Sequence, residues 1–494
     1  MKTLRFTKYV ALAGAMGFLA SCNNFLDIND NPNAVVVAPA ASLMVASQTS
    51  MGFIAGSDLH RYSSLISQQF AGQGGAGIQN VAADRGIITG TDVNNVFRTS
   101  IYAAALADMQ RMILDNQTTN PVYAGIGKIM QGYLFLMTTD SFGDIPFSEA
   151  LKFAENGAPI YDKSGDVYKG IVTLINSGID DVKKTAGLKP ATDDLIYGGD
   201  LVKWQKFANT LKMRLYIHYY PKFPADASKG IGDLLTAAAA TPNTLMTGIA
   251  DNFQLRFETA AGKTNPIDQF ERQRPNQFFP SANLVGLMNA KVDPRRASFF
   301  LDFPLGSNLY VGAGNGTGGI GAPNISFSRA HTYLRGARTG TGFQDYDGSA
   351  PIRMMTYAEY QFILAEYYAR TNDLVKAQLA FEAGINTSMT MAGVTGGGTS
   401  GAAAYIAARP AFTAANAIQQ IIEEKYVANY GVVSEPWTDY RRTGFPVLLL
   451  PAAAQASSIL RILPYADADR AANPLNTPLR SDLTLPSVFW DPGK

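Results

Sequence analysis

Hydrophobic side chains recur every three to four residues along much of this chain, which is the spacing of an amphipathic helix. The clearest case covers residues 166–184, where one face carries Val167, Ile171, Leu174, Ile175, Ile179 and Val182. Residues 123–139 are apolar on nearly every side, which indicates a buried helix. Further helices are predicted from Ser42 onward and over residues 95–116, 201–220, 283–289 and 414–430.

Two helices after Thr356 have the spacing of a tetratricopeptide unit, a helix–turn–helix with fixed small and large packing positions. The turn is Thr371-Asn372-Asp373, and the matching positions are Leu364, Ala365, Tyr368, Ala377, Phe381 and Gly384. Residues 245–280 are mixed, with short strands expected near 253–257, and the Gly-rich residues 304–350 predict a long loop region. The predicted fold class is therefore mainly α, with tetratricopeptide-like helix pairs and long loop-rich excursions.

The first two dozen residues follow the pattern of an exported lipoprotein. Lys2, Arg5 and Lys8 form a basic head, and the apolar run over residues 10–20 is too short to span a bilayer stably. The run ends at Leu-Ala-Ser-Cys22, which resembles the lipobox of bacterial lipoproteins, and Cys22 is the only cysteine of the sequence. The lipobox implies cleavage before Cys22 and acylation of that residue with chains such as palmitate. The alternative is an ordinary secretory signal with an incidental cysteine.

The predicted organisation is a signal peptide over residues 1–21, a lipidated tether over 22–40 and a single helical domain over 41–494. Charged residues make up 16% of the chain, with 41 Lys and Arg against 40 Asp and Glu. Removal of the leader takes away three basic residues, so the mature chain is slightly acidic. This balance argues against nucleic acid or an anionic membrane surface as the main partner. The abundance of small and uncharged polar residues suits an uncharged, hydrogen-bonding ligand.

Four segments carry recognisable motifs. They are SCNNFLDINDNPNA at the lipobox; Gly132-Tyr133 followed by TTDSFGDIPFSEA over residues 138–150; residues 194–200 with Trp204, Lys206, Phe207, Asn209, Leu211, Lys212 and Arg214; and residues 435–446, 461–465, 473–476 and 489–491. In combination these segments span nearly the whole chain and resemble the SusD/RagB family, more narrowly its SusD-like branch. The acid usually expected after Pro464-Tyr465 is displaced to Asp467 or Asp469, and Phe489 stands where the family often has Trp.

The resemblance implies a nutrient-binding lipoprotein of the outer membrane, anchored through lipid and facing the cell exterior. It implies an α-helical fold in which tetratricopeptide-like helix pairs carry a loop-rich ligand face. It also implies a SusC-like TonB-dependent transporter as partner, on which the lipoprotein sits as a lid. The residues themselves had indicated export, a lipid anchor and helix pairs, and the transporter comes from the resemblance alone.

The sequence offers no catalytic, metal or cofactor site. Its three histidines are scattered, and no nucleophile elbow or phosphate-binding loop is present. The two carboxylates of a glycosidase face each other across a cleft, whereas sequence neighbours on a helix do not. We therefore interpret the adjacent acids at residues 180–181, 193–194 and 423–424 as solvated faces. Three further interpretations are structural: Asp140 and Asp144 serve in caps or turns, and Arg441-Arg442 is buried against Asp439 or loop backbone.

Recognition of a neutral glycan needs aromatic rings and planar polar side chains. The loop region 304–350 supplies both, and its candidate ligand-binding residues are Tyr310, Tyr333, Phe343 and Tyr346 with Asn308, Asn324, Gln344 and Asp345 interleaved. A second candidate group is Gln68, Gln69, Phe70 and Gln73. The alternative is that these aromatic rings hold the loop against the helices.

The sequence thus predicts a surface lipoprotein, not an enzyme, that captures an oligosaccharide and delivers it to the transporter. The rival hypotheses are a lipid-anchored glycoside hydrolase, a helical-repeat scaffold that binds only protein, and a binding protein for peptides instead of glycans.

Overall fold

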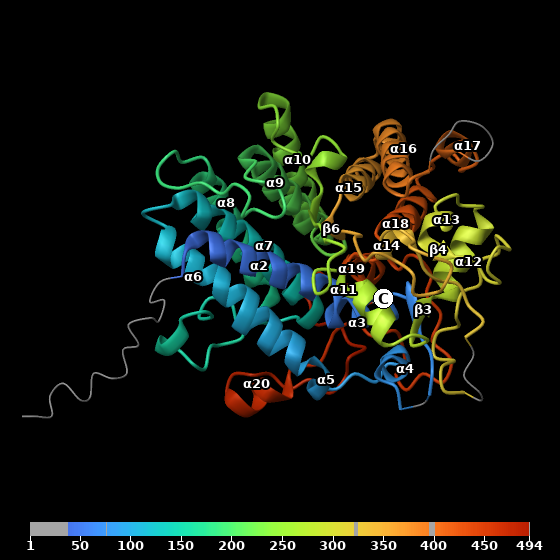
Figure 1. The fold of residues 1–494 in the computed structure, drawn as a ribbon. Coiled ribbons are helices and arrows are strands. Elements are labelled where there is room, and N and C mark those ends of the chain that lie inside the picture. The colour runs from blue at the N-terminus through green and yellow to red at the C-terminus, as the bar shows by residue number, and fades with distance from the viewer. Residues whose placement is uncertain (1–37, 76, 321–324, 395–400, 494) are drawn as a thin grey trace, which may run out of the picture. The chain divides into compact units, whose positions relative to one another are not determined.

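Helix α7 (Pro121–Phe142) is the core of the N-terminal half of the fold (Figure 1). The computed structural model describes residues 38–75, 77–320, 325–394 and 401–493. Every residue of α7 is buried except Lys128, as the all-round apolar pattern predicts. Pro121 occupies the first turn, where its missing N–H costs no hydrogen bond, and Gly143 ends the helix with a φ of +80°.

Helices pack around α7 on several sides, and the predicted helices of this half are confirmed. Its neighbours are α2 (Ala40–Gly56), η2 (Asn95–Leu106), α6 (Ala107–Asn116), α8 (Ser164–Val182) and α9 (Leu201–His218). The predicted helix over 95–116 begins as a π-helix, η2, and continues as α6. Two more helices complete this half, α3 (Asp58–Ile66) against α2 and α10 (Pro224–Ala240) against α9.

The predicted tetratricopeptide-like pair is α15 (Tyr357–Arg370) and α16 (Leu374–Met391), which pack along each other (Figure 1). Ala365 and Phe381 belong to one buried cluster. A Cβ on Gly384 would come within 2.9 Å of the Phe362 ring, so only glycine permits this approach of the two helices. The pair is joined by α17 (Ala402–Ala407) and α18 (Ala417–Ala428). The predicted fold class, mainly α with tetratricopeptide-like helix pairs, is confirmed.

The remaining elements are short. Three two-stranded antiparallel pairs form, β1 (Phe70–Gly72) with β3 (Phe278–Pro280), β2 (Phe253–Leu255) with β6 (Ile352–Met355), and β4 (Phe300–Leu301) with β5 (Arg329–Ala330). The short helices are α4 (Gln79–Asp84), α5 (Gly90–Asn94), α11 (Pro266–Gln273), α12 (Ala282–Ala290), α13 (Arg296–Phe299), α14 (Thr332–Arg335), α19 (Glu435–Thr443) and α20 (Asp467–Ala472), with 3-10 turns at Phe153–Glu155 and Ile249–Asp251. Between 304 and 350, β5 and α14 are the regular elements among the described residues.

A buried ionic network joins the two halves of the fold. Arg442 on α19 lies between Glu366 on α15 and Asp439 one turn earlier, and all three side chains are inaccessible to solvent. Nearby, Arg214 on α9 pairs with Glu359, and Lys425 on α18 bonds Glu435 at 2.7 Å and Asp439 at 3.1 Å. The sequence-based interpretation of Arg441 and Arg442 as buried structural cations is therefore confirmed: Arg441 donates to the carbonyl oxygen of Arg461 at 2.8 Å.

The interpretation of the adjacent acid pairs as solvated faces is wrong for one member of each. Glu424 is fully buried between Arg295 and the Tyr405 hydroxyl. Asp194 is buried under the indole N–H of Trp204, which donates to it at 2.8 Å. Asp181 is buried between Lys128 and Lys184. Residues 180–181 and 423–424 lie on helices, where one of two neighbouring side chains can turn inward, whereas residues 193–194 lie outside a helix. In each pair the buried acid needs the cation or donor that only the tertiary fold supplies.

Asp144 has the cap role that we predicted, whereas the cap or turn role predicted for Asp140 is wrong, because Asp140 lies in the last turn of α7 and bonds distant side chains. Asp144 accepts the backbone N–H of Ser164 at 2.9 Å, at the first turn of α8. Asp140 is buried and accepts hydrogen bonds from the Tyr168 hydroxyl and, at 3.2 Å, from the indole N–H of Trp490. Burial raises the pKa of Asp140, while the nearby imidazole of His218 and the Tyr168 hydrogen bond act to lower it.

Buried acids and buried histidines set opposing pH dependences of stability. Burial raises the pKa of Glu271 and of Asp84 to about 7, so these two carboxyl groups act to raise the free energy of unfolding as the pH falls from 7 to about 5. Burial lowers the pKa of His60 and of His331 to about 4, so these two imidazoles act to lower it over the same range, because there the unfolded state binds their protons more readily. Burial also acts to raise the pKa of Glu366, but Arg442 and Arg370 lower it to about 2. Lys291 and Arg295 likewise lower that of Glu424 to about 2. Below about pH 4.5 the free energy of unfolding should fall.

Urea titrations at a series of pH values measure this profile. Glu271→Gln removes one acid with a raised pKa, so its free energy of unfolding should fall relative to that of the wild type as the pH decreases from 7 to 5, while both proteins lose stability in the same way below pH 4.5. Parallel profiles of the two proteins between pH 7 and 5 would contradict the raised pKa of Glu271.

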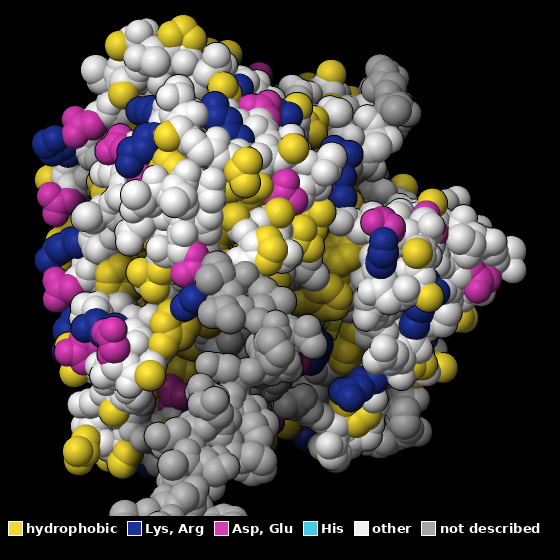
Figure 2. Space-filling view, turned by 60° about the vertical axis from the view of Figure 1, so that its left-hand side comes forward, with side chains coloured by type: hydrophobic (Ala, Val, Ile, Leu, Met, Phe, Trp, Pro, Cys, Tyr) yellow, Lys and Arg dark blue, Asp and Glu magenta, His cyan; other side chains and the backbone are white. Residues whose placement is uncertain are grey.

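Residues Ala40–Lys494 form one compact unit. No helix in its described part is both long and apolar enough to cross a membrane. The predicted signal peptide, Cys22 and most of the predicted tether lie in residues 1–37, outside the described residues. The face in Figure 2 carries Lys/Arg and Asp/Glu side chains interspersed, without the continuous basic patch that nucleic acid requires.

Candidate functional site

An open cleft of about 520 Å³ lies between α2, α3, η2 and α11. Two aromatic rings line it, Phe53 and Phe270. Its polar lining comes from planar or hydroxyl side chains that include Arg61, Gln79, Asn95, Thr99, Ser100 and Gln273. This combination provides a flat apolar surface for a sugar ring beside donors and acceptors for its hydroxyl groups.

Arg61 is the main charged donor of the cleft. It forms an ion pair with Asp58 one turn earlier on α3, and its guanidinium carbon lies 4.3 Å from the centroid of the Phe270 ring. Burial, with Arg274 nearby, lowers the pKa of Arg61 to about 10, although Tyr62 acts to raise it. The group therefore stays protonated at neutral pH, and its contacts with Asp58 and Phe270 fix its position.

A hydrogen-bond chain orients Gln79 at the edge of the cleft. Its amide nitrogen donates to the Tyr62 hydroxyl at 2.8 Å and to the Asp92 carboxylate at 2.9 Å. Asp92 is itself held in a capping box with Thr89 at the start of α5. Both hydrogen bonds that the Gln79 amide nitrogen donates are thus made within the protein, and they fix the orientation of the side chain in the absence of a ligand.

A stack of aromatic rings supports Phe270 from behind. Phe278 lies edge-on to Phe270 with centroids 6.1 Å apart, Phe70 stacks on Phe278 at 4.1 Å, and Tyr430 stacks on Phe70 at 5.3 Å. His60 packs edge-on against this stack, and burial lowers its pKa to about 4, so it is neutral. The cleft thus has a rigid apolar back wall.

The second sequence-predicted group, Gln68 to Gln73, is wrong as an exposed ligand face. Gln68, Gln69, Phe70 and Gln73 are all buried. Gln69 donates to the carbonyl oxygen of Tyr426 at 2.8 Å, and Phe70 is part of the stack behind the cleft. These residues join β1 to the C-terminal half of the fold.

Two of the four predicted aromatic residues in 304–350 are buried, so their prediction as exposed sugar platforms is wrong. The Tyr333 ring packs on Phe299 at 4.5 Å and under the Arg353 guanidinium at 3.7 Å. The Tyr346 hydroxyl lies 2.6 Å from Nδ1 of His331, and Arg335 covers its ring at 4.1 Å. Both rings hold the excursion against the rest of the fold.

The other predicted residues lie nearer the surface. Phe343 is 42% exposed, with the Arg329 guanidinium 5.1 Å from its ring. Tyr310 is partly buried beside Arg296. Asn308 is exposed in a left-handed turn, where its backbone N–H donates to Asp302 at 2.8 Å. Gln344 and Asp345 are partly buried, and Asn324 lies outside the described residues.

The excursion contributes to the cleft by positioning α11. Asp268 on α11 is fully buried and accepts from Arg335 at 2.8 Å and from Arg272 at 2.5 Å. Arg335 also donates to the Phe343 carbonyl oxygen at 2.9 Å and to Gln344 at 2.8 Å. The loop over 335–346 is thereby connected to the helix that carries Phe270 and Gln273. Its exposed residue Phe343 lies beside the chain that follows Arg274, because Arg329 contacts both the Phe343 ring and the Asn276 side chain.

The π-helix η2 forms the wall opposite α11. Asn95, Thr99 and Ser100 face the cleft, whereas Phe97 and Ile101 are buried on the other side. π-Helical turns are rare in proteins and are frequently found at functional sites.

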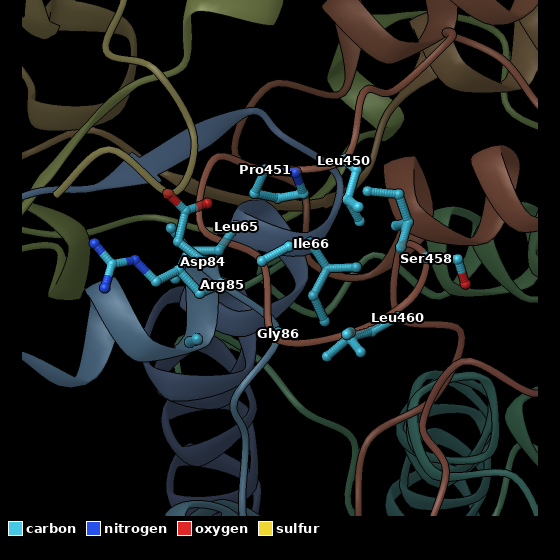
Figure 3. A pocket seen from close by; sticks show the side chains of 13 residues that line it. Leu65, Ile66, Asp84, Arg85, Gly86, Leu450, Pro451, Ser458 and Leu460 are labelled. Atoms are coloured by element: carbon cyan, nitrogen blue, oxygen red, sulfur yellow. The ribbon is translucent and has the colours of Figure 1, made fainter. Parts of the chain in front are cut away.

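Two other cavities fit a sugar less well. The pocket in Figure 3 lies between α3, α4 and the segment 450–460; Leu65, Ile66 and Leu450 converge on it, whereas Arg85 points away. Its volume of about 20 Å³ holds about one water molecule. A cleft of about 620 Å³ between α8, α9 and the end of α10 is large enough, but no aromatic side chain is among its described lining residues.

Comparison with known proteins agrees with this architecture. Residues 32–465 match the model of a SusD-like family described as "Starch-binding associating with outer membrane". The chain belongs to the SusD-like family. The family predicted from the sequence motifs is therefore confirmed, and with it the association of the family with the outer membrane. No curated protein matches the chain.

Solved SusD-like structures share the fold of this SusD-like chain. A chitin-binding SusD homolog from Flavobacterium johnsoniae is 21% identical, with a TM-score of 0.72 over 91% of this chain and 98% of the other. A SusD/RagB family protein from Bacteroides thetaiotaomicron is 23% identical, with a TM-score of 0.71 over 88% of this chain and 95% of the other. At these identities the likeness shows the fold.

The residues lining the cleft of this SusD-like chain were not singled out from the sequence. They come from four separate stretches: 50–61, Gln79, 95–104 and 270–274. One local signal existed, the polar run over residues 271–277 directly after Phe270. Such a run is equally typical of any exposed turn, so it could not identify a cleft wall by itself.

Proposed function

We propose that this chain is a cell-surface lipoprotein that binds an uncharged oligosaccharide and delivers it to a SusC-like TonB-dependent transporter of the outer membrane. The observation that carries the proposal is the cleft between α3, η2 and α11, where Phe270 and Arg61 lie beside several amide and hydroxyl groups, of which Gln79 is held in place by two hydrogen bonds. The starch-binding description of the family and the chitin-binding neighbour support a glycan as the ligand class. The lipid anchor and the transporter rest on the lipobox and on family resemblance.

The lining of the cleft supports binding without catalysis. Asp58 is the one carboxylate among the described residues that line it, and it is neutralised by Arg61. A glycosidase needs two carboxyl groups about 5–10 Å apart across the scissile bond. The hydrolase alternative would therefore have to use acids elsewhere. Asp58 and Arg61 neutralise each other, so Arg274 is the remaining charge among the described lining residues and offers a charged peptide a single partner. The scaffold alternative does not explain the open polar volume of the cleft.

Replacing Phe270 with Ala should weaken oligosaccharide binding about tenfold. The substitution removes the ring under the sugar and the surface on which Arg61 rests, and each contact contributes on the order of 1 kcal/mol. Phe343→Ala should weaken binding about threefold, because Arg329 contacts both the exposed Phe343 ring and Asn276, which is two residues beyond the cleft residue Arg274. Calorimetry with starch-derived and chitin-derived oligosaccharides measures both, and circular dichroism of the same samples checks the fold.

Phe223→Ala is the matched control, because Phe223 is 39% exposed and lines none of the clefts described. Binding that survives Phe270→Ala but is lost in Phe343→Ala would place the ligand on the excursion instead of in the cleft. Release of shortened sugars during incubation with the wild-type protein would favour the hydrolase alternative. Binding of peptides but of neither sugar series would replace the glycan.

A further inference from the structure

A second cleft, of about 480 Å³, lies on the opposite flank of the π-helix η2. Residues of η2 alternate between the two: Asn95 and Thr99 line the first cleft, and Arg98, Tyr102 and Ala103 line the second. The other wall is the loop over 146–159, which contains the end of the TTDSFGDIPFSEA motif. Neither the fold nor the first cleft accounts for this cavity.

The loop presents an aromatic ring from a strained backbone. Phe153 is 47% exposed and has a φ of +52°, and Leu151 two residues earlier has a φ of +61°. Bulky residues rarely adopt this left-handed region, and such conformations persist where the surrounding structure enforces them, most often at functional sites. Exposure of a large apolar ring in this conformation brings no packing benefit to the fold itself.

Glu149 enforces the loop conformation. Its carboxylate accepts hydrogen bonds from the Asn156 side chain at 3.1 Å and from the backbone N–H of Ile160 at 3.2 Å. The side-chain Oδ1 of Asn156 in turn accepts from the backbone N–H of Ala158 at 3.0 Å. The loop is therefore pre-formed around the cleft.

The chemistry of the second cleft matches that of the first. The Tyr102 ring forms part of its floor, with its hydroxyl donating to the Pro146 carbonyl oxygen at 2.7 Å. The rim carries planar polar groups: Arg98, which donates to the Ala468 carbonyl oxygen at 2.8 Å, and Asn473, which donates to that of Pro159 at 2.7 Å. Aromatic rings with a rim of amide and guanidinium groups again suit the faces and hydroxyl groups of sugars.

We propose that this second cleft binds a further stretch of the same glycan, so that one long chain occupies both flanks of η2. This proposal rests on the proposed glycan-binding function. It predicts that the protein binds a long oligosaccharide more tightly than a short one. A helix with its side chains is about 10–12 Å across, so a short oligosaccharide occupies one cleft and only a longer one reaches both. The second contact is then intramolecular, and the longer ligand should bind at least about tenfold more tightly.

Calorimetry with a trisaccharide and an octasaccharide, from starch and from chitin, tests this length dependence. Two variants act on the second cleft in different ways: Phe153→Ala removes its exposed ring, and Ala103→Trp fills the cavity from the η2 side. Each should weaken octasaccharide binding about five- to tenfold and change trisaccharide binding by less than about twofold. Phe223→Ala should change neither.

Four results would overturn the proposal. Octasaccharide binding unchanged by both variants would show that the second cleft holds no sugar. Equal losses for both ligand lengths would make it the primary site instead of an extension. If the wild-type protein binds neither series at any length, the proposed function fails and the second site fails with it, whereas binding with no length dependence removes the second site alone.

Discussion

Replacing Arg442 with Met should lower the free energy of unfolding by roughly 3 kcal/mol. Arg442 donates to Glu366 at 2.6 Å and to Asp439 at 2.6 Å, and all three groups are excluded from water. Removal of one partner of a buried ion pair typically costs 3–5 kcal/mol, because the remaining charge stays buried without its counter-ion. We expect the lower end of this range, since Arg370 still contacts Glu366 and Lys425 still contacts Asp439.

Urea unfolding followed by circular dichroism measures the loss. Arg470→Met is the control, because Arg470 is exposed on α20 and the same change of charge there should alter the free energy of unfolding by less than about 0.5 kcal/mol. A loss below about 1 kcal/mol in Arg442→Met would mean that the network contributes little to stability. The connection between α19 and α15 would then rest on apolar packing alone.

Replacing Cys22 with Ala should abolish lipid attachment completely. Acylation requires the thiol, and Cys22 is the only cysteine in the sequence. Each buried CH₂ of an acyl chain contributes about 0.8 kcal/mol to membrane binding, and stable anchoring takes two or more chains. Removal of this one thiol should therefore release the protein from the membrane.

Metabolic labelling with a fatty acid, followed by membrane fractionation, measures attachment in cells. Ser21→Ala retains the thiol and should keep the label, which separates loss of the acylation site from a general effect on the leader. Label retained by Cys22→Ala would contradict the lipoprotein assignment. An ordinary secretory signal would instead leave both variants unlabelled, as it would the wild-type protein.

The predicted ligand face and the observed cleft are related through one helix. Tyr346 was predicted from the sequence as a ligand-binding residue and Arg335 was not, yet both side chains are buried. Arg335 links the excursion to Asp268 on α11. That helix presents Phe270 and Gln273 to the cleft. The aromatic residues of the excursion therefore act mainly as its anchor, which was the alternative interpretation of the same pattern.

The sequence by itself determined the features that depend on local order along the chain. Hydrophobic periodicity is a property of neighbouring residues, so it located α7, α8, α9 and the α15–α16 pair, and the motif spacing identified the family. The position of Gly384 against Phe362 followed from the tetratricopeptide spacing for the same reason.

Tertiary structure decided which polar and aromatic side chains face water. Glu424 and Glu423 are adjacent in sequence, yet Glu424 is buried because Arg295, more than a hundred residues away, supplies its counter-charge. Tyr346 and Phe343 are three residues apart, yet Tyr346 is buried with its hydroxyl 2.6 Å from Nδ1 of His331, whereas Phe343 is 42% exposed. The cleft itself joins four distant stretches. A polar group is buried only where the fold places a hydrogen-bond or ion-pair partner beside it. Such long-range contacts produce no periodic pattern in the sequence.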